Sequence, residues 1–96
     1  MTIHWTERAQ DDLAAIHTFI EADSTHSAVV TVRRLLGAVE RLQDLPHSGR
    51  AVPEFSDPEI REVVMRPYRI VYRIVGPTEI HALTGHQGAR ETLEAV

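Results

Sequence analysis

The sequence contains no cysteine and no lysine, and it has no long apolar run. Without cysteine, neither a disulfide scaffold nor a cysteine metal site is possible. All ten basic residues are arginine, which the composition of a GC-rich genome would explain. No apolar segment approaches the roughly 20 residues that a membrane-spanning helix needs. The first residues, MTIHWTERAQDDL, lack the charged and then apolar layout of a signal peptide, so we expect a cytoplasmic protein with no membrane partner.

The length of 96 residues fits one domain over residues 1–96, and we find no repeat, linker or low-complexity segment. The net charge is −4, but it is unevenly distributed. Residues 1–49 hold four arginines and seven acidic residues, whereas residues 60–90 hold five arginines and two acidic residues. We therefore expect the first half to be the scaffold and the second half to carry any anion-facing surface.

Two amphipathic helices are predicted in the first half. Residues 3–5 form a short predicted strand, and Thr6 is the expected N-cap of a helix that runs to about Glu21. Apolar residues recur there at helical spacing: Ala9, Leu13, Ile16 and Ile20. After a polar turn, with Asp23 and Ser24 as cap candidates, a second helical pattern begins at Ala28. It ends before Pro46, about 20 residues later, and the two helices are expected to form a hairpin.

Three strands are predicted in the second half, at residues 61–65, 68–75 and 79–86. Residues 76–78, GPT, form a hairpin turn, and Arg66-Pro67 interrupts the first two strands as a bend or bulge. The order of elements is then β-α-α-β-β-β. The predicted fold class is α+β, with the helical hairpin packed on one face of a small antiparallel sheet.

Side chains in the strand at 68–75 alternate between two faces of the predicted sheet. One face suits burial beneath the helices because it carries Tyr68, Ile70, Tyr72 and Ile74. The other face would then expose Arg69 and Arg73, and such a face is either solvated or binds an anion. The alternative for Arg69 is an ion pair with Glu62 or Glu54 that stabilises the sheet.

Short motifs follow one another along nearly the whole chain. They are W-T-x-x-A-x-x-D-L-x-x-I (5–16), L-x-x-L-P-x-x-G-R (42–50), V-P-E (52–54), R-E (61–62), Y-R-I-V-Y-R (68–73) and the late histidine His86. In this order and spacing they resemble the RelE/ParE superfamily of bacterial toxins from type II toxin–antitoxin systems. The resemblance implies a toxin that a cognate antitoxin holds inactive within a hetero-oligomeric complex.

The superfamily includes two activities, and the resemblance leaves both open. RelE-like members are metal-independent endoribonucleases that cut mRNA on the ribosome, and their catalytic positions would fall on Glu54, Arg69 and His86. ParE-like members instead poison DNA gyrase. We favour the ParE-like reading because a net charge of −4 opposes an approach to ribosomal phosphates. A third reading is an inactive partner that only binds the antitoxin.

The residues predicted to bind the antitoxin or the target are Arg61, Arg69, Arg73 and Arg90. For Arg73 the alternative is a solvated surface residue, and for His86 it is a hydrogen-bonded structural histidine. The other histidines show no metal-ligand spacing and are predicted to be structural or exposed: His4, His17, His26, His47 and His81. We therefore expect no metal site and no cofactor.

Overall fold

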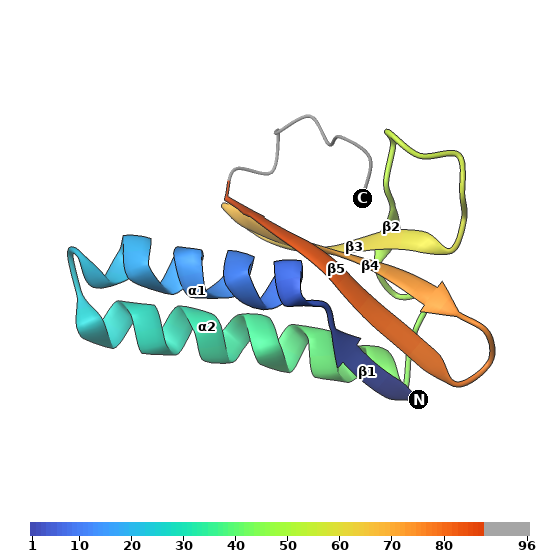
Figure 1. Cartoon of the computed structure of the whole chain (residues 1–96), viewed down its shortest axis with the longest axis horizontal. Coiled ribbons are helices and arrows are strands. Elements are labelled where there is room, and N and C mark those ends of the chain that lie inside the picture. Colours follow the sequence, from blue (N-terminus) through green and yellow to red (C-terminus); the bar gives the residue numbers. More distant parts are fainter. Residues whose placement is uncertain (88–96) are drawn as a thin grey trace.

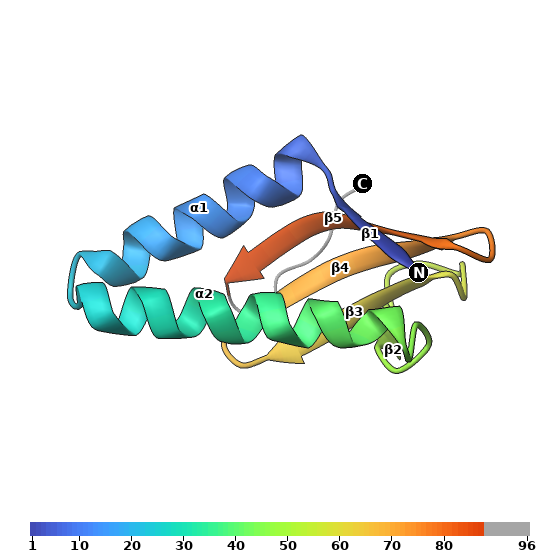
Figure 2. The ribbon, with the colours of Figure 1, turned by 90° about the horizontal axis from the view of Figure 1, so that it is seen from below.

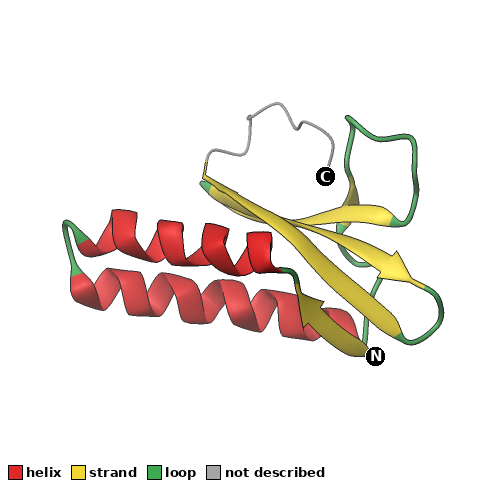
Figure 3. Cartoon of the chain, viewed as in Figure 1, coloured by secondary structure: helices red, strands yellow, loops and turns green. Residues whose placement is uncertain are grey.

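The computed structural model describes residues 1–87, in which a helical hairpin packs against one face of a five-stranded sheet (Figures 1 and 3). The elements in chain order are β1 (Thr2–Trp5), α1 (Glu7–Glu21), α2 (Thr25–Glu40), the 3₁₀ turn η1 (Arg41–Gln43), β2 (Arg50–Ala51), β3 (Ile60–Met65), β4 (Tyr68–Val75) and β5 (Glu79–Gln87). The predicted α+β class, the hairpin and the three later strands are confirmed. The second helix is shorter than predicted because its last turn tightens into η1.

The sheet has the strand order β1-β5-β4-β3-β2 and is mixed. Strands β2 to β5 pair antiparallel, but β1 pairs with β5 in parallel. The prediction of a wholly antiparallel sheet is therefore wrong at this edge. Two parallel strands need a long connection between them, and here residues 6–78 form that connection. The two-residue strand β2 was also missed, because it is too short to show any alternation.

The helix starts follow from local hydrogen bonds. Thr6 Oγ1 accepts a hydrogen bond from the Ala9 N–H at 3.1 Å, as its predicted capping role requires. It also donates to the Ala82 carbonyl at 2.9 Å, which fastens the start of α1 to β5. Ser24 caps α2 by accepting a hydrogen bond from the Ser27 N–H at 3.1 Å. Thr6 thus both caps α1 and holds the start of the hairpin against the sheet.

The main core lies between the helices and the sheet, and Figure 2 shows the hairpin extending beyond the strands on one side. Its buried side chains include Ile16, Leu35, Val39, Ile70, Tyr72 and Ile80. A second, smaller cluster forms where Val52 and Phe55 pack near Val71. The face of β4 opposite the helices is therefore partly covered by the loop before β3. It is not the open face that the alternation predicted.

Candidate functional site

The candidate site is the sheet face turned away from the helices, where charged side chains of β2, β3 and β4 meet. The register places Arg50 opposite Glu62, and Glu62 opposite Val71 of β4. Arg69 lies two residues before Val71 and so points to the same face. We use the name charged face for four residues: Arg50, Glu62, Arg69, and Glu54 of the loop between β2 and β3.

Glu62 is at the centre of the charged face. Its Oε1 accepts a hydrogen bond from Arg50 Nε at 2.7 Å, and its Oε2 accepts one from Arg69 Nη1 at 2.9 Å. Arg69 Nη2 also lies 3.5 Å from Glu54 Oε2. The side chains of Glu62 and Arg69 are 0% and 2% exposed, whereas that of Arg50 is 56% exposed. The predicted exposure of Arg69 is wrong, and the alternative of an ion pair with Glu62 and Glu54 is confirmed.

His86 lies beside this network on β5, where it is the register partner of Arg69. Its Nε2 is 2.8 Å from Thr84 Oγ1, a hydrogen bond along the same strand. The structure therefore brings together the three residues predicted to be catalytic in a ribonuclease, Glu54, Arg69 and His86. Arg69 already lies beside two carboxylates in this arrangement, those of Glu54 and Glu62, and a catalytic role for the three residues remains a prediction.

Two of the remaining predicted binding residues, Arg61 and Arg73, hydrogen-bond to loops. Arg61 Nη1 donates to the Gly49 carbonyl at 2.9 Å, and Arg61 Nε donates to the Pro58 carbonyl at 3.0 Å. Arg73 Nη1 donates to Asp57 Oδ2 at 2.8 Å. Arg90 lies outside the described residues. Binding roles for these arginines remain predictions.

Arg50 is a member of the charged face that the sequence analysis did not place there. Its position depends on the pairing of β2 with β3, and a two-residue strand leaves no periodic signal in the sequence. The sequence shows that Arg50 follows Gly49 in a turn, but no neighbouring residue indicates that its side chain reaches Glu62. Only the structure shows that Glu62 is held between two guanidinium groups.

Asp57 provides a pH-dependent test of the loop that covers the second cluster. A hydrogen bond from the Glu59 N–H at 2.9 Å and then the Arg73 guanidinium hold the pKa of Asp57 below its ordinary value. A lowered pKa in the folded state stabilises the fold above the ordinary carboxyl pKa, and the effect is lost as the pH falls through the folded value. We expect the melting-temperature difference between the native protein and Asp57→Asn to shrink from pH 7 to pH 3. A difference that is constant with pH would contradict this assignment.

Uncovered apolar side chains lie mainly on the helical hairpin. A groove of about 560 Å³ runs between the two helices and β1, lined by Trp5, Leu13, Val32 and Leu36 among others. Phe19, near the far end of α1, is 59% exposed, although it is a large apolar residue. A groove lined by apolar side chains, as beside Trp5 and Leu36, marks a site where proteins bind partners. Within residues 1–87, no helix has both the length and the apolar character to span a membrane.

An α+β domain with this hairpin and mixed sheet has close relatives among toxins. Residues 3–88 match the family model described as the ParE toxin of the type II toxin–antitoxin system parDE. Over 80 residues the chain is 40% identical to "Putative toxin Y4kP" of Sinorhizobium fredii, which covers 81% of this chain and 80% of that protein. A solved structure described as "Chromosomal ParDE TA system from P. aeruginosa" aligns with a TM-score of 0.74 and 25% identity, over 92% of this chain and 96% of that one.

The chain therefore belongs to the ParE toxin family of type II toxin–antitoxin systems. The similarity to the RelE/ParE superfamily that the sequence motifs indicated is confirmed, and so is the preference for the ParE branch. The family model matches residues 3–88 and the structural alignment covers 92% of this chain, so the fold as a whole, and not one motif, is shared.

Proposed function

We propose that this toxin inhibits growth by poisoning DNA gyrase, and that a cognate antitoxin binds and neutralises it in the cytoplasm. The observation that carries the proposal is the match of residues 3–88 to the ParE family. ParE-like members poison gyrase, whereas RelE-like members cut mRNA. The toxin needs no metal or cofactor for this function, because it acts by binding.

The charged face supports this choice over the ribonuclease. A ribonuclease would need Arg69 to neutralise a phosphate, but this side chain is buried and lies beside Glu54 and Glu62. The net charge of −4 also opposes binding to RNA. Arg69 then serves to hold the sheet together, and the surface that contacts gyrase lies elsewhere.

The apolar groove on the hairpin is the surface that suits the antitoxin. A single domain of this size leaves apolar side chains uncovered, and a folded partner segment would bury them. The antitoxin would cover the groove beside Trp5 and Leu36, and the toxin would persist in cells as a toxin–antitoxin hetero-oligomer. Exposed Phe19 is not part of this groove, because it lies on another side of α1 with Gly85 and His86.

The test uses purified toxin, freed of antitoxin, in two parallel assays. One assay measures supercoiling and DNA cleavage by gyrase, and the other measures cleavage of a defined mRNA on ribosomes. Gyrase-dependent double-strand breaks with intact mRNA would support the proposal. Cut codons with unaffected gyrase would establish the ribonuclease instead. Inactivity in both assays, with antitoxin binding intact, would indicate an inactive antitoxin-binding partner.

His86→Ala is the variant that best separates the two activities. His86 is only half-buried, so its removal is less disruptive than removal of buried Arg69. We expect the variant to keep its melting temperature within a few degrees and to remain toxic when expressed without antitoxin. Loss of toxicity in a folded His86→Ala protein, together with loss of mRNA cleavage, would favour the ribonuclease.

Thr84→Val provides the matched control for this substitution. Thr84 is fully buried, and valine keeps its shape while it removes the hydroxyl that bonds His86 Nε2. If both variants change toxicity only in proportion to their loss of stability, the role of His86 is structural. A toxicity defect that is specific to His86→Ala would show that the imidazole itself acts in the toxic reaction.

A further inference from the structure

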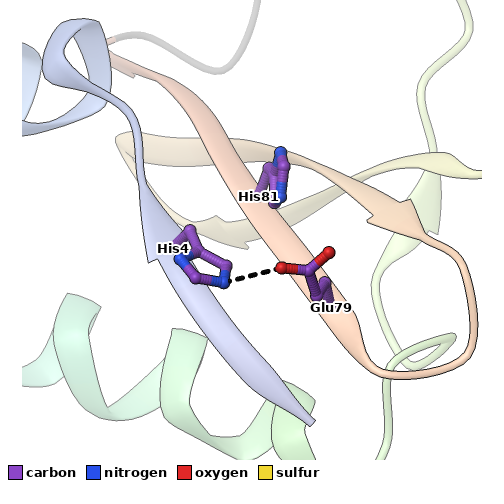
Figure 4. A group of neighbouring side chains, drawn as sticks. All are labelled: His4, Glu79 and His81. Carbon is purple, nitrogen blue, oxygen red and sulfur yellow. Dashed lines mark ion pairs between the residues drawn. The ribbon is translucent and has the colours of Figure 1, made fainter.

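Two histidines and one glutamate from β1 and β5 lie side by side on the sheet (Figure 4). The parallel register makes His4 the partner of His81. Glu79 lies two residues before His81 on β5, so its side chain points to the same face. Positions 4, 79 and 81 have no motif spacing in the sequence. The three side chains come together only through the parallel pairing that the sequence did not reveal.

The distances suit a bound metal ion. His4 Nε2 is 3.0 Å from Glu79 Oε1, and the rings of His4 and His81 are edge to face with centroids 5.3 Å apart. One ligand atom from each residue lies within 4.8 Å of the other two. Zinc bonds nitrogen and oxygen at about 2.0–2.2 Å, which puts tetrahedral ligand atoms about 3.4 Å apart. Small torsions of the half-exposed His4 and Glu79 side chains close this difference.

The ligand types select the class of metal. Two imidazole nitrogens and one carboxylate oxygen suit Zn²⁺ and its neighbours in the transition series, whereas Mg²⁺ and Ca²⁺ take oxygen ligands. Arg73 of β4 is the register partner of His81, and an uncompensated positive charge there would oppose the binding of a metal cation. Its Nη1 donates to Asp57 Oδ2 at 2.8 Å, so a carboxylate already compensates its charge. The cluster is thus a plain N₂O donor set on an accessible surface.

We propose that His4, Glu79 and His81 form a binding site for a divalent transition-metal ion such as Zn²⁺. The three side chains occupy three positions of a four-coordinate ion and leave the fourth for solvent or for a ligand atom of a bound molecule. The ion joins β1 to β5 through side chains, in addition to their backbone pairing. The site is independent of the toxin's target and does not require the gyrase proposal.

The test is a titration of tag-free toxin with Zn²⁺, followed by calorimetry and by thermal unfolding. We expect saturable binding of one ion per chain and a rise in melting temperature, because a ligand that binds only the folded state stabilises it. The imidazole resonances of His4 and His81 should shift together in NMR spectra. His81→Ala should weaken binding at least about tenfold, since even loss of an outer-shell partner typically costs 10- to 100-fold.

His47→Ala is the matched control. His47 Nε2 lies 3.7 Å from Glu59 Oε1 with exposures of 57% and 45%, close to the 50% and 45% of His4 and Glu79. Within residues 1–87 this pair is not part of a three-residue ligand group. Its removal should leave zinc affinity unchanged. Equal affinity in His81→Ala and His47→Ala, or no saturable binding to the native protein, would overturn the proposal.

A second variant tests the zinc site in case His81→Ala fails to fold. Glu79→Gln keeps the size and shape of the side chain and removes the anionic oxygen that a zinc ion prefers. We expect it to fold as the native protein does in the absence of metal and to lose zinc affinity. If Glu79→Gln is folded and binds zinc as tightly as the native protein, Glu79 is not a ligand and the proposed site is wrong.

Discussion

Replacing Glu62 with alanine is expected to lower the unfolding free energy by about 3–5 kcal/mol, the usual cost of removing one partner from a buried ion pair. The carboxylate is 0% exposed and accepts hydrogen bonds from both Arg50 and Arg69. Without it, the guanidinium of Arg69, which is 2% exposed in the native protein, loses its closest carboxylate. Urea unfolding of both proteins, with a common slope, would measure the difference.

Two variants test this explanation of the Glu62 effect. Arg50→Ala removes a partner whose side chain is 56% exposed, so the expected loss is at most about 1 kcal/mol. The double variant Glu62→Leu with Arg69→Met replaces the buried pair by apolar side chains and should recover much of the lost stability. If Arg50→Ala costs as much as Glu62→Ala, burial is not the reason for the effect.

Gly49→Ala is expected to lower the unfolding free energy by about 3 kcal/mol. A Cβ at this position would overlap the hydroxyl of Tyr72 and lie 2.8 Å from the Glu62 carbonyl oxygen. Tyr72 is fully buried, and its hydroxyl accepts a hydrogen bond from the Gly49 N–H at 3.1 Å and donates one to the Pro46 carbonyl at 2.7 Å. Overpacking costs about 1–3 kcal/mol and each weakened hydrogen bond about 1 kcal/mol.

Gly37→Ala is the control for Gly49→Ala. Gly37 lies in α2, and no atom lies within 4 Å of a Cβ added there. Alanine has the higher helix propensity, so this substitution should raise stability by up to about 1 kcal/mol. Opposite signs for the two glycine substitutions would support the contact with Tyr72. Equal destabilisation by both would contradict it.

Features that depend on neighbouring residues were predictable from the sequence. The apolar spacing of α1 and the cap at Thr6 lie within a few residues of each other, and both appear as predicted. The alternation in β4 also separated the buried tyrosine side from the arginine side correctly, because it reflects only the strand's own geometry. Local periodicity thus predicted the two helices and the three longer strands, and in β4 it also predicted the inner face.

Features that depend on distant segments were not predictable. Alternation says nothing about what covers the second face, and the loop that carries Val52 and Phe55 buries Val71 there. Arg69 became buried for the same reason, although its pairing with Glu62 and Glu54 was one of two readings that the residue types allowed. The cluster of His4 with His81 required the parallel register, which no short pattern encodes.

The pairing of β1 with β5 has a consequence for how the toxin is made. The hydrogen bond from Thr6 to Ala82 joins residues 76 positions apart, so it forms only after Ala82 has been synthesised. Until then the first strand has no neighbour, while the helical hairpin can already assemble from local contacts. A nascent chain that stops before residue 79 therefore lacks the strand that anchors its own beginning. The edge strand β1 therefore joins the sheet late, after β5 has been synthesised, whereas the helical hairpin depends on contacts that form earlier.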